Sequence, residues 1–205
     1  STDHRDSPPP PKLAWPANTT DVRLKEGVYD VAGVTLLSGA SVVGAGIDKT
    51  VIRLTKPVRA ALDGRSQQVR SNILLRGFTL DCGAKATDTN FARSGISGYR
   101  WKDCVVEKVK VVGLGSYSTK AGLDQAESFG IIISNSTNCV IRDCVVDKNT
   151  GGYVSAYLIS GNDMMGSNLV ARFRYDNEWR KALDNFAGIL QAFTFGGGSE
   201  PDGSR

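Results

Sequence analysis

The sequence predicts an all-β fold, a parallel β-helix solenoid of about five coils, with a proline-rich arm before it and an amphipathic helix after it. Two observations predict the coils. Segments that fit one template recur at a nearly constant spacing, as in stacked-repeat proteins. These segments are β-branched and aliphatic, with Gly, Asn and Asp at their breaks, which indicates strands and turns rather than pairs of helices.

The first element is a proline-rich arm, predicted over residues 1–21. Four consecutive prolines at positions 8–11 favour an extended polyproline II segment. We expect this arm to be a linker; a ligand for a proline-binding domain is the alternative. The β-helix is predicted over residues 22–175, because short β-branched segments begin near Val22.

Copies of the template begin at Ser41, Asn72, Asp103 and Asn138, and a weaker fifth copy begins at Asn168. The steps between them are 31, 31, 35 and 30 residues. The three clearest copies read NILLRGFTLD, DCVVEKVKVV and NCVIRDCVVD. One copy in each coil would stack equivalent residues in columns along the axis, because each repeat contacts its neighbours.

Alternation within the template assigns the two faces of these strands. The predicted inward columns are Leu75, Val106 and Ile141; Phe78, Val109 and Cys144; and Leu80, Val111 and Val146. An outward column is expected to stack Arg76, Glu107 and Arg142 as a charge ladder, each exposed pair contributing about 0–1 kcal/mol. Lys108 is expected beside Asp143 in the next column.

A second strand repeats with the coil. Gly95 and Gly130 each lie eight residues before the next template, and each is followed by an apolar segment. The stretches 82–94 and 113–128 precede these strands and are rich in Gly, Ser, Thr, Asp and Lys. Insertions in solenoids form loops on one face, which is often the binding face.

The period breaks after Arg172, and a helix is predicted over residues 176–195. Its apolar residues are spaced 4, 3, 4 and 3 apart, which places them on one helical face. They are Trp179, Leu183, Phe186, Leu190 and Phe193. We expect this helix to cap the solenoid or to contact another subunit, since an open coil exposes strand edges. Residues 196–205 are expected to form a flexible tail.

The composition argues against several classes of partner. A net charge of +4 gives no reason to expect nucleic acid, and no apolar run approaches the roughly 20 residues of a membrane span. His4 is the only histidine, and the four cysteines form no C-x-x-C pair, so we predict no metal site and no cofactor. Cys104 and Cys139 share a column, where they would form either stacked thiols or a disulfide.

Five segments carry a family resemblance: GVYDV (27–31), SVVGAGIDKTVIRL (41–54), LRGFTLD (75–81), VIRDCVVDKN (140–149) and GGYVSAY (151–157). Residues 27–163, about two thirds of the chain, resemble the right-handed parallel β-helix of the pectate-lyase-like superfamily. Within it the chain is most similar to the catalytic modules of mannuronan C-5 epimerases and to related phage tail-spike proteins. The resemblance implies the fold more than the function, because this fold hosts many activities.

The same resemblance implies where the acid–base groups of an epimerase would lie. The family motif is Tyr-Gly-x-Asp-Pro-His, and the aligned stretch here, residues 129–134, reads FGIIIS. Phe129 replaces the tyrosine, aliphatic residues and Ser134 replace the aspartate and histidine, and a later aspartate falls at about Ala156. The chain is therefore not expected to be an epimerase or lyase of this type.

Two sets of candidate residues remain. A shifted catalytic site would use side chains of the loop beside this face, namely Tyr117, Lys120, Asp124 and Glu127, unless that loop is merely solvated. Aromatic side chains that could stack on sugar rings are Tyr99, Trp101, Tyr117, Tyr153 and Tyr157, with a place in the core or rim as the alternative.

The leading prediction is a polysaccharide-recognising β-helix module, or a component of a virion or cell-surface spike, without epimerase-type catalysis. One alternative is an active polysaccharide lyase, epimerase or hydrolase with its carboxylates elsewhere. Another is a purely structural spike subunit, for which a homotrimer is expected. Each of these places the chain outside the cell or on a virion surface.

Overall fold

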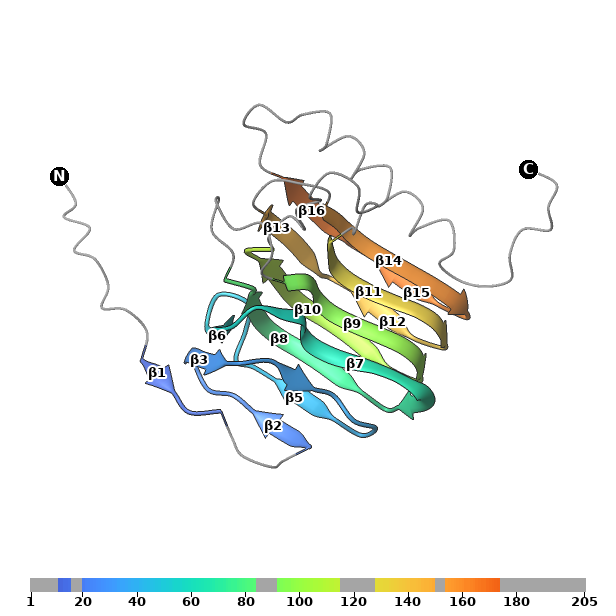
Figure 1. The fold of residues 1–205 in the computed structure, drawn as a ribbon, viewed down its shortest axis with the longest axis horizontal. Coiled ribbons are helices and arrows are strands. Elements are labelled where there is room, and N and C mark those ends of the chain that lie inside the picture. Colours follow the sequence, from blue (N-terminus) through green and yellow to red (C-terminus); the bar gives the residue numbers. More distant parts are fainter. Residues whose placement is uncertain (1–10, 16–19, 84–91, 115–127, 150–153, 174–205) are drawn as a thin grey trace.

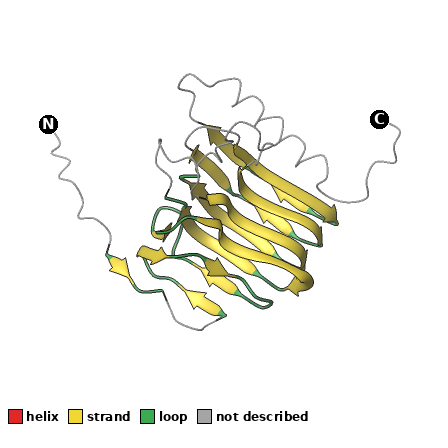
Figure 2. Ribbon diagram, viewed as in Figure 1, coloured by secondary structure: helices red, strands yellow, loops and turns green. Residues whose placement is uncertain are grey.

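A computed structural model describes residues 11–15, 20–83, 92–114, 128–149 and 154–173. All regular secondary structure in these ranges is β-strand (Figure 2). The predicted helix over 176–195, the tail over 196–205 and most of the proline-rich arm lie outside the described residues.

The strands form two sheets, and every pairing between strands is parallel. The larger sheet has eleven strands: β1 (Lys12–Leu13), β2 (Asp21–Arg23), β3 (Gly27–Val31), β5 (Ser41–Val43), β6 (Thr50–Leu54), β8 (Leu74–Asp81), β10 (Val105–Val112), β12 (Val140–Arg142), β13 (Val145–Asn149), β15 (Met165–Ser167) and β16 (Val170–Phe173). The second sheet has five: β4 (Val34–Thr35), β7 (Val58–Ser71), β9 (Ala92–Lys102), β11 (Ser128–Thr137) and β14 (Val154–Asn162).

The chain alternates between these sheets as it climbs along one axis, so the fold is a parallel β-helix (Figure 1). The five-stranded sheet runs in the order β14-β11-β9-β7-β4, so strands that follow one another along the chain in this sheet lie side by side. The strand β1 already pairs with β3, and the amide of Val28 donates to the carbonyl of Pro11. The described part of the sheet therefore begins at Lys12, before the boundary predicted near residue 22.

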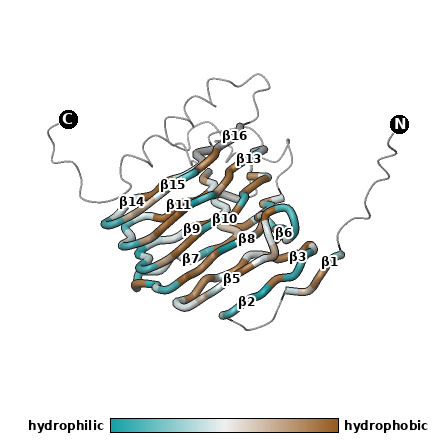
Figure 3. Tube along the Cα trace, turned by 180° about the vertical axis from the view of Figure 1, so that it is seen from behind, coloured by the Kyte–Doolittle hydropathy of each residue, from teal (hydrophilic) through white to brown (hydrophobic). Residues whose placement is uncertain are grey.

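The predicted columns of the three central copies are confirmed. Strand β10 pairs with β8 so that Val106 lies beside Leu75 and Val111 beside Leu80, and β12 and β13 continue both columns. The inward side chains of these columns are fully buried, whereas hydrophilic residues gather toward the strand ends (Figure 3). The core is thus a stack of aliphatic layers between the sheets.

The first and last copies are out of register with the prediction. Ser41 pairs with Leu74 rather than with Asn72, so the first copy is displaced by two residues. In the last coil Val140 pairs with Met165, which places Asp163, and not Asn168, beside Asn138. The last coil is therefore five residues shorter than predicted.

Residues with a left-handed backbone conformation explain both the turns and the wrong register predicted for the last coil. Asn72, Asp103, Asn138 and Asp163 have φ between 49° and 57°, and each lies two residues before a strand of the larger sheet. A second left-handed residue follows five positions later in each of these coils: Gly77, Lys108, Asp143 and Asn168. Because Asn and Asp tolerate this conformation, either corner fits the start of the template.

Side-chain amides tie each kind of corner to the equivalent corner of the neighbouring coil. Asn138 Nδ2 donates to Asp103 Oδ1 over 2.7 Å, and Asn168 Nδ2 donates to Asp143 Oδ1 over 2.9 Å. The register places Lys108 beside Asp143 in the stack, as predicted, and the hydrogen bond to the Asp143 carboxylate comes from Asn168 on the next coil.

All four cysteines are buried free thiols. Cys104 and Cys139 lie in one column, as predicted, because their neighbours Val105 and Val140 pair. Each thiol donates to a backbone carbonyl, Cys104 to that of Lys102 over 3.2 Å. Of the two alternatives, stacked thiols describe this structure and a disulfide does not.

The charge ladder forms, but its centre is buried. Glu107 accepts from the Nε of Arg76 and, over 2.5 Å, from the Nε of Arg142, and its side chain is 6% exposed against 44% and 47% for the arginines. The sequence predicted three exposed charges instead. Burial would raise the pKa of Glu107, but hydrogen bonds from Arg142 and Arg76 and their charges outweigh it and lower the pKa.

Replacement of Glu107 tests this ladder. Glu107→Gln should lower the free energy of unfolding by about 1–2 kcal/mol near neutral pH. This value is at the low end of the range for hydrogen bonds between charged groups, because the two arginines are half exposed. Because the pKa of Glu107 is lower in the folded state, its ionised form stabilises the fold at pH values above the unfolded-state pKa of about 4.3. This stabilisation is lost as the pH falls through the folded-state pKa. Urea titrations should therefore show the difference near neutral pH, and the difference should shrink as the pH falls below about 4.3.

The control is Arg23→Gln, which removes the exposed pair of Arg23 and Asp21 and should change stability by about 0–1 kcal/mol. An equal effect of both variants at every pH would contradict the account of the buried ladder.

Candidate functional site

A groove of about 660 Å³ lies on the five-stranded sheet and crosses β7, β9 and β11. Its volume is typical of ligand pockets. Eleven residues line it: Arg59, Arg65, Ser66, Gln67, Ser94, Ser97, Gly98, Tyr99, Phe129, Ile132 and Ser134. Three stacked strands position these side chains, so the groove has a rigid base.

Strand alternation gives this sheet its two faces. Ile96 and Ile131 pair across β9 and β11 and are fully buried. The next residues, Ser97 and Ile132, also pair and line the groove. The inner face therefore belongs to the core, and the outer face is available to a ligand.

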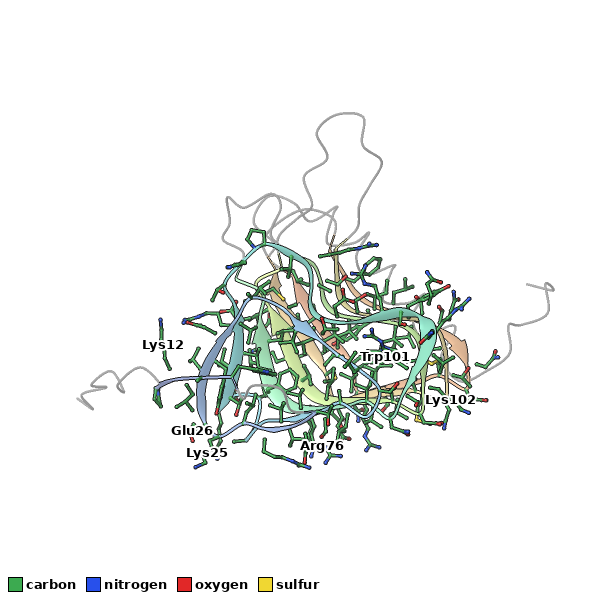
Figure 4. The ribbon with its side chains drawn as sticks, turned by 60° about the horizontal axis from the view of Figure 1, so that its bottom comes forward. Lys12, Lys25, Glu26, Arg76, Trp101 and Lys102 are labelled. Atoms are coloured by element: carbon green, nitrogen blue, oxygen red, sulfur yellow. The ribbon has the colours of Figure 1, made fainter. Side chains whose placement is uncertain are left out.

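The base of the groove lies over the indole of Trp101. Trp101 is 1% exposed, and its Nε1 donates to the carbonyl of Gly64 over 2.8 Å. A Cβ on Gly64 or Gly98 would lie within 2.7 Å of the indole, so only glycine leaves room for the ring. Figure 4 shows Trp101 inside the coil, whereas Arg76 lies on its outside.

A hydrogen-bonded corner fixes the strand ends beside the groove. The amide of Trp101 donates to Ser136 Oγ over 2.9 Å, and that hydroxyl donates to the carbonyl of Ser134 over 2.9 Å. Arg100 and Asn135 are left-handed at this corner, with φ of 56° and 51°. This break in the strands turns Trp101 inward although Tyr99, two residues before it, faces the groove.

One end of the groove is basic, and its guanidinium is fixed in place. Arg65 forms a fork with Asp63: Nε donates to Oδ1 over 2.9 Å and Nη2 to Oδ2 over 2.6 Å. The amide of Arg65 also donates to Asp63 Oδ1 over 3.0 Å. Such a fork orients the remaining nitrogen, Nη1, for a further acceptor. The exposed Arg59 lines the same groove.

Asp63 is an ionised partner of these arginines. Burial would raise its pKa, but the hydrogen bonds from Arg65 and the charges of Arg65 and Arg59 outweigh it and lower the pKa. A carboxyl group held ionised in this way is poorly suited to proton transfer near neutral pH. Its role is to orient Arg65.

The aromatic side chain at the centre is Tyr99. It pairs with Arg65 on one neighbouring strand and with Ser134 on the other. The guanidinium carbon of Arg100 lies 5.5 Å from the centre of its ring, and Arg100 Nη1 also donates to the carbonyl of Gln67 over 2.7 Å. Hydrogen bonds with Asn135 and Arg100 lower the pKa of Tyr99. The ring is thus held in one position beside the basic end.

The structure divides the aromatic candidates. Tyr99 lines the groove, and its contact with a sugar stays a prediction. Trp101 and Tyr157 are each 1% exposed, and the hydroxyl of Tyr157 donates to the carbonyl of Val170 over 2.9 Å. For these two the core alternative is correct, because neither ring can meet a ligand. Tyr117 and Tyr153, and the catalytic candidates Lys120, Asp124 and Glu127, lie outside the described residues.

The stretch aligned with the epimerase motif does reach the groove. Phe129, Ile132 and Ser134 of residues 129–134 line it. Among the eleven lining residues of the described chain, none is acidic. The described lining of the groove therefore provides cations, hydroxyls and apolar surface.

Sequence reasoning missed Arg59, Arg65 and the serines of this groove. The glycines at inward positions 64 and 98 were a usable signal, because such glycines in strands mark a close approach of another group. Arg65 is harder to recognise, since β7 has a register shift between Arg65 and Arg70 that hides its alternation.

The described ranges contain no group of three or more His, Cys, Asp or Glu side chains that could hold a metal ion. The part of the chain that the structure describes also has no apolar helix of membrane-spanning length.

Comparison with known proteins gives one match. No protein-family model matches the chain, and no curated protein sequence matches it. Among solved structures, the chain is similar to the A-module of the mannuronan C-5 epimerase AlgE4 from Azotobacter vinelandii, at 25% identity and a TM-score of 0.46. The match covers 74% of this chain and 45% of that one, so the chain spans less than half the length of that structure.

Proposed function

We propose that this β-helix binds a polysaccharide with acidic groups in the groove on its five-stranded sheet, without epimerase-type acid–base chemistry. The observation that carries this proposal is the fixed guanidinium of Arg65 one strand away from the ring of Tyr99. A guanidinium can bind a carboxylate, and an aromatic ring can stack on the apolar face of a sugar. A module of this kind would act outside the cell or on a virion surface.

Three features support binding over catalysis. The groove is open and built on strands, so a long polymer can lie across it. Its described lining has no acidic residue, and Asp63 beside it is ionised and bound to Arg65. At the positions where the family resemblance implies a catalytic Asp and His, this chain has Ile132 and Ser134, and neither side chain exchanges protons near neutral pH.

Binding should depend on Tyr99. Tyr99→Ala should weaken the binding of a polyuronate such as alginate or pectate by about tenfold, since loss of one stacked ring is worth about 1.4 kcal/mol. Calorimetric titration measures this. Arg23→Gln, on the first coil away from the groove, is the control and should bind like the wild type.

Binding should also depend on the charge of Arg65. The double variant Asp63→Asn with Arg65→Gln keeps the net charge and leaves no unpaired carboxylate, and should weaken binding by about 10–100-fold. The wild type should lose affinity as salt rises, and the double variant should lose less. Equal salt dependence of the two proteins would show that Arg65 does not contact the polymer.

The same samples separate the alternative functions. Unsaturated or shortened sugar products would indicate a lyase or hydrolase and would direct attention to Asp124 and Glu127. No binding to any polymer would favour a purely structural role. The predicted homotrimer is tested by mass measurement in solution.

A further inference from the structure

We propose that the groove selects a glycan unit that carries a short acyl ester, such as an O-acetyl group, at a position set apart from its acidic group. This inference rests on the proposed function and names the class of polysaccharide. It follows from the uneven distribution of side chains across the groove.

Polarity falls from one side of the groove to the other. One outward row across the strands reads Asp63, Ser97, Ile132 and Leu158. The β7 side carries Arg59 and Arg65, whereas the β11 side carries Phe129 and Ile132. A ligand that crosses the strands therefore meets cations at one end and an apolar surface at the other.

The apolar end is unusual for an outer sheet face. Ile132 lies between the fully buried Ile131 and Ile133, yet its own side chain is partly exposed and faces outward. Phe129 is also partly exposed and lines the same end. Solvent-facing sheet positions are normally polar, so two large apolar side chains in one groove indicate an apolar group of a ligand.

Serine hydroxyls beside this apolar end are available to a ligand. Ser94 and Ser97 are 7% and 5% exposed and line the groove. Ser97 pairs with Ile132, and Ser134 follows Ile132 by two residues on the same face. Within the part of the chain that the structure describes, no side-chain hydrogen bond occupies these hydroxyls. In the described ranges only Ser41 Oγ is buried without a hydrogen-bond partner, so these three serine oxygens reach solvent and can exchange water for polar atoms of a ligand.

An acyl ester fits both features. Its carbonyl oxygen accepts a hydrogen bond from a serine hydroxyl, and its methyl group packs on Ile132 and Phe129. A free sugar hydroxyl over Ile132 would lose water without gaining a partner. An unsubstituted hexuronate has a carboxylate at C6 and no methyl group, and an acyl ester on a ring hydroxyl supplies one.

The spacing fits one sugar or two adjacent sugars. Arg65 and Ser134 lie on β7 and β11, the two strands beside β9, so they are separated by about 10 Å at about 4.8 Å per strand. The carboxylate would bind Arg65, the sugar ring would lie over Tyr99, and the acyl group would reach Ile132.

The test compares one polymer with and without its esters. O-acetylated polymannuronate and the same sample after mild alkaline de-O-acetylation are titrated into the wild type. The acetylated polymer should bind about five- to tenfold more tightly, near the lower limit of what one small apolar group contributes in a pocket. Ile132→Ser should abolish this preference, so that it binds the two polymers equally well.

Leu158→Ser is the matched control, since Leu158 pairs with Ile132 on the same face but does not line the groove. It should keep the preference. Phe129→Leu, which keeps an apolar side chain, provides a second variant in case Ile132→Ser folds poorly, and should reduce the preference. Circular dichroism checks that each variant is folded.

Each remaining outcome overturns the inference. Equal or weaker binding of the acetylated polymer by the wild type removes the acyl preference but leaves polysaccharide binding intact. A preference that survives Ile132→Ser places the acyl site elsewhere. Absence of binding to both polymers overturns the proposed function together with the inference.

Discussion

Trp101→Ala should lower the free energy of unfolding by about 3–5 kcal/mol, the range for removal of a buried aromatic side chain. The indole fills the space beneath Gly64 and Gly98, where the strands have no side chains of their own. Its removal would leave a cavity under the groove and an unpaired carbonyl on Gly64, which now accepts from Nε1. Urea titration with linear extrapolation measures the loss.

Two further variants show whether the ring packs as described. Trp101→Phe keeps most of the apolar contact but loses the hydrogen bond to Gly64, so it should cost less than Trp101→Ala. Gly98→Ala places a Cβ 2.6 Å from the indole and should cost about 1–3 kcal/mol in the wild type. That cost should fall in the Trp101→Ala background, because the vacated space accepts the methyl group. A loss below about 1 kcal/mol for Trp101→Ala would contradict the buried position.

Gly161→Ala should be at least as damaging, with a loss of about 3 kcal/mol or more. Gly161 has φ of 137°, and a Cβ there would overlap the carbonyl of Ser136 and lie 2.6 Å from its nitrogen. Strained backbone costs about 1–3 kcal/mol and overpacking a similar amount. Ser136 also holds the Trp101 amide, so a shift would spread to the corner beside the groove.

The chain provides a matched control in Gly39. Its φ is 77°, so alanine there is also strained, but no atom lies within 4 Å of an added Cβ. Gly39→Ala should therefore cost only about 1–2 kcal/mol, the strain alone. Thermal and urea unfolding of both variants separate the two contributions. If the variants lose equal stability, Gly161 does not pack on Ser136 as described.

The central coils could be predicted from the sequence because alternation and period act together there. Val106 lies beside Leu75 and Ile141, as the template requires, since a shift by one residue would turn every apolar side chain outward. Near the ends only one neighbouring copy constrains the alignment. The two left-handed corners of each coil, such as Asn138 and Asp143, then match the template equally well.

The groove was less predictable, because it depends on residues that meet across coils. Trp101 follows Tyr99 by two residues, and simple alternation would place both rings on one face. The left-handed Arg100 between them reverses the phase and buries Trp101. Alternation also does not reveal the fork between Arg65 and Asp63, which needs the side-chain geometry of β7.

The placement of Tyr99 and Arg65 on adjacent strands explains why a rigid sheet can serve as the recognition surface. Each side chain is held by a second contact, Tyr99 by Arg100 and Arg65 by Asp63. Side chains fixed in this way lose little conformational freedom when a ligand binds. The affinity of the groove is therefore expected to depend on these fixed groups more than on its buried area.

A crystal structure of the chain with a short oligouronate bound tests the central claim most directly. We expect a carboxylate of the sugar on the guanidinium of Arg65 and a sugar ring over Tyr99, across β7, β9 and β11. An oligosaccharide bound to the larger sheet or elsewhere, with Arg65 and Tyr99 free of it, would contradict the account.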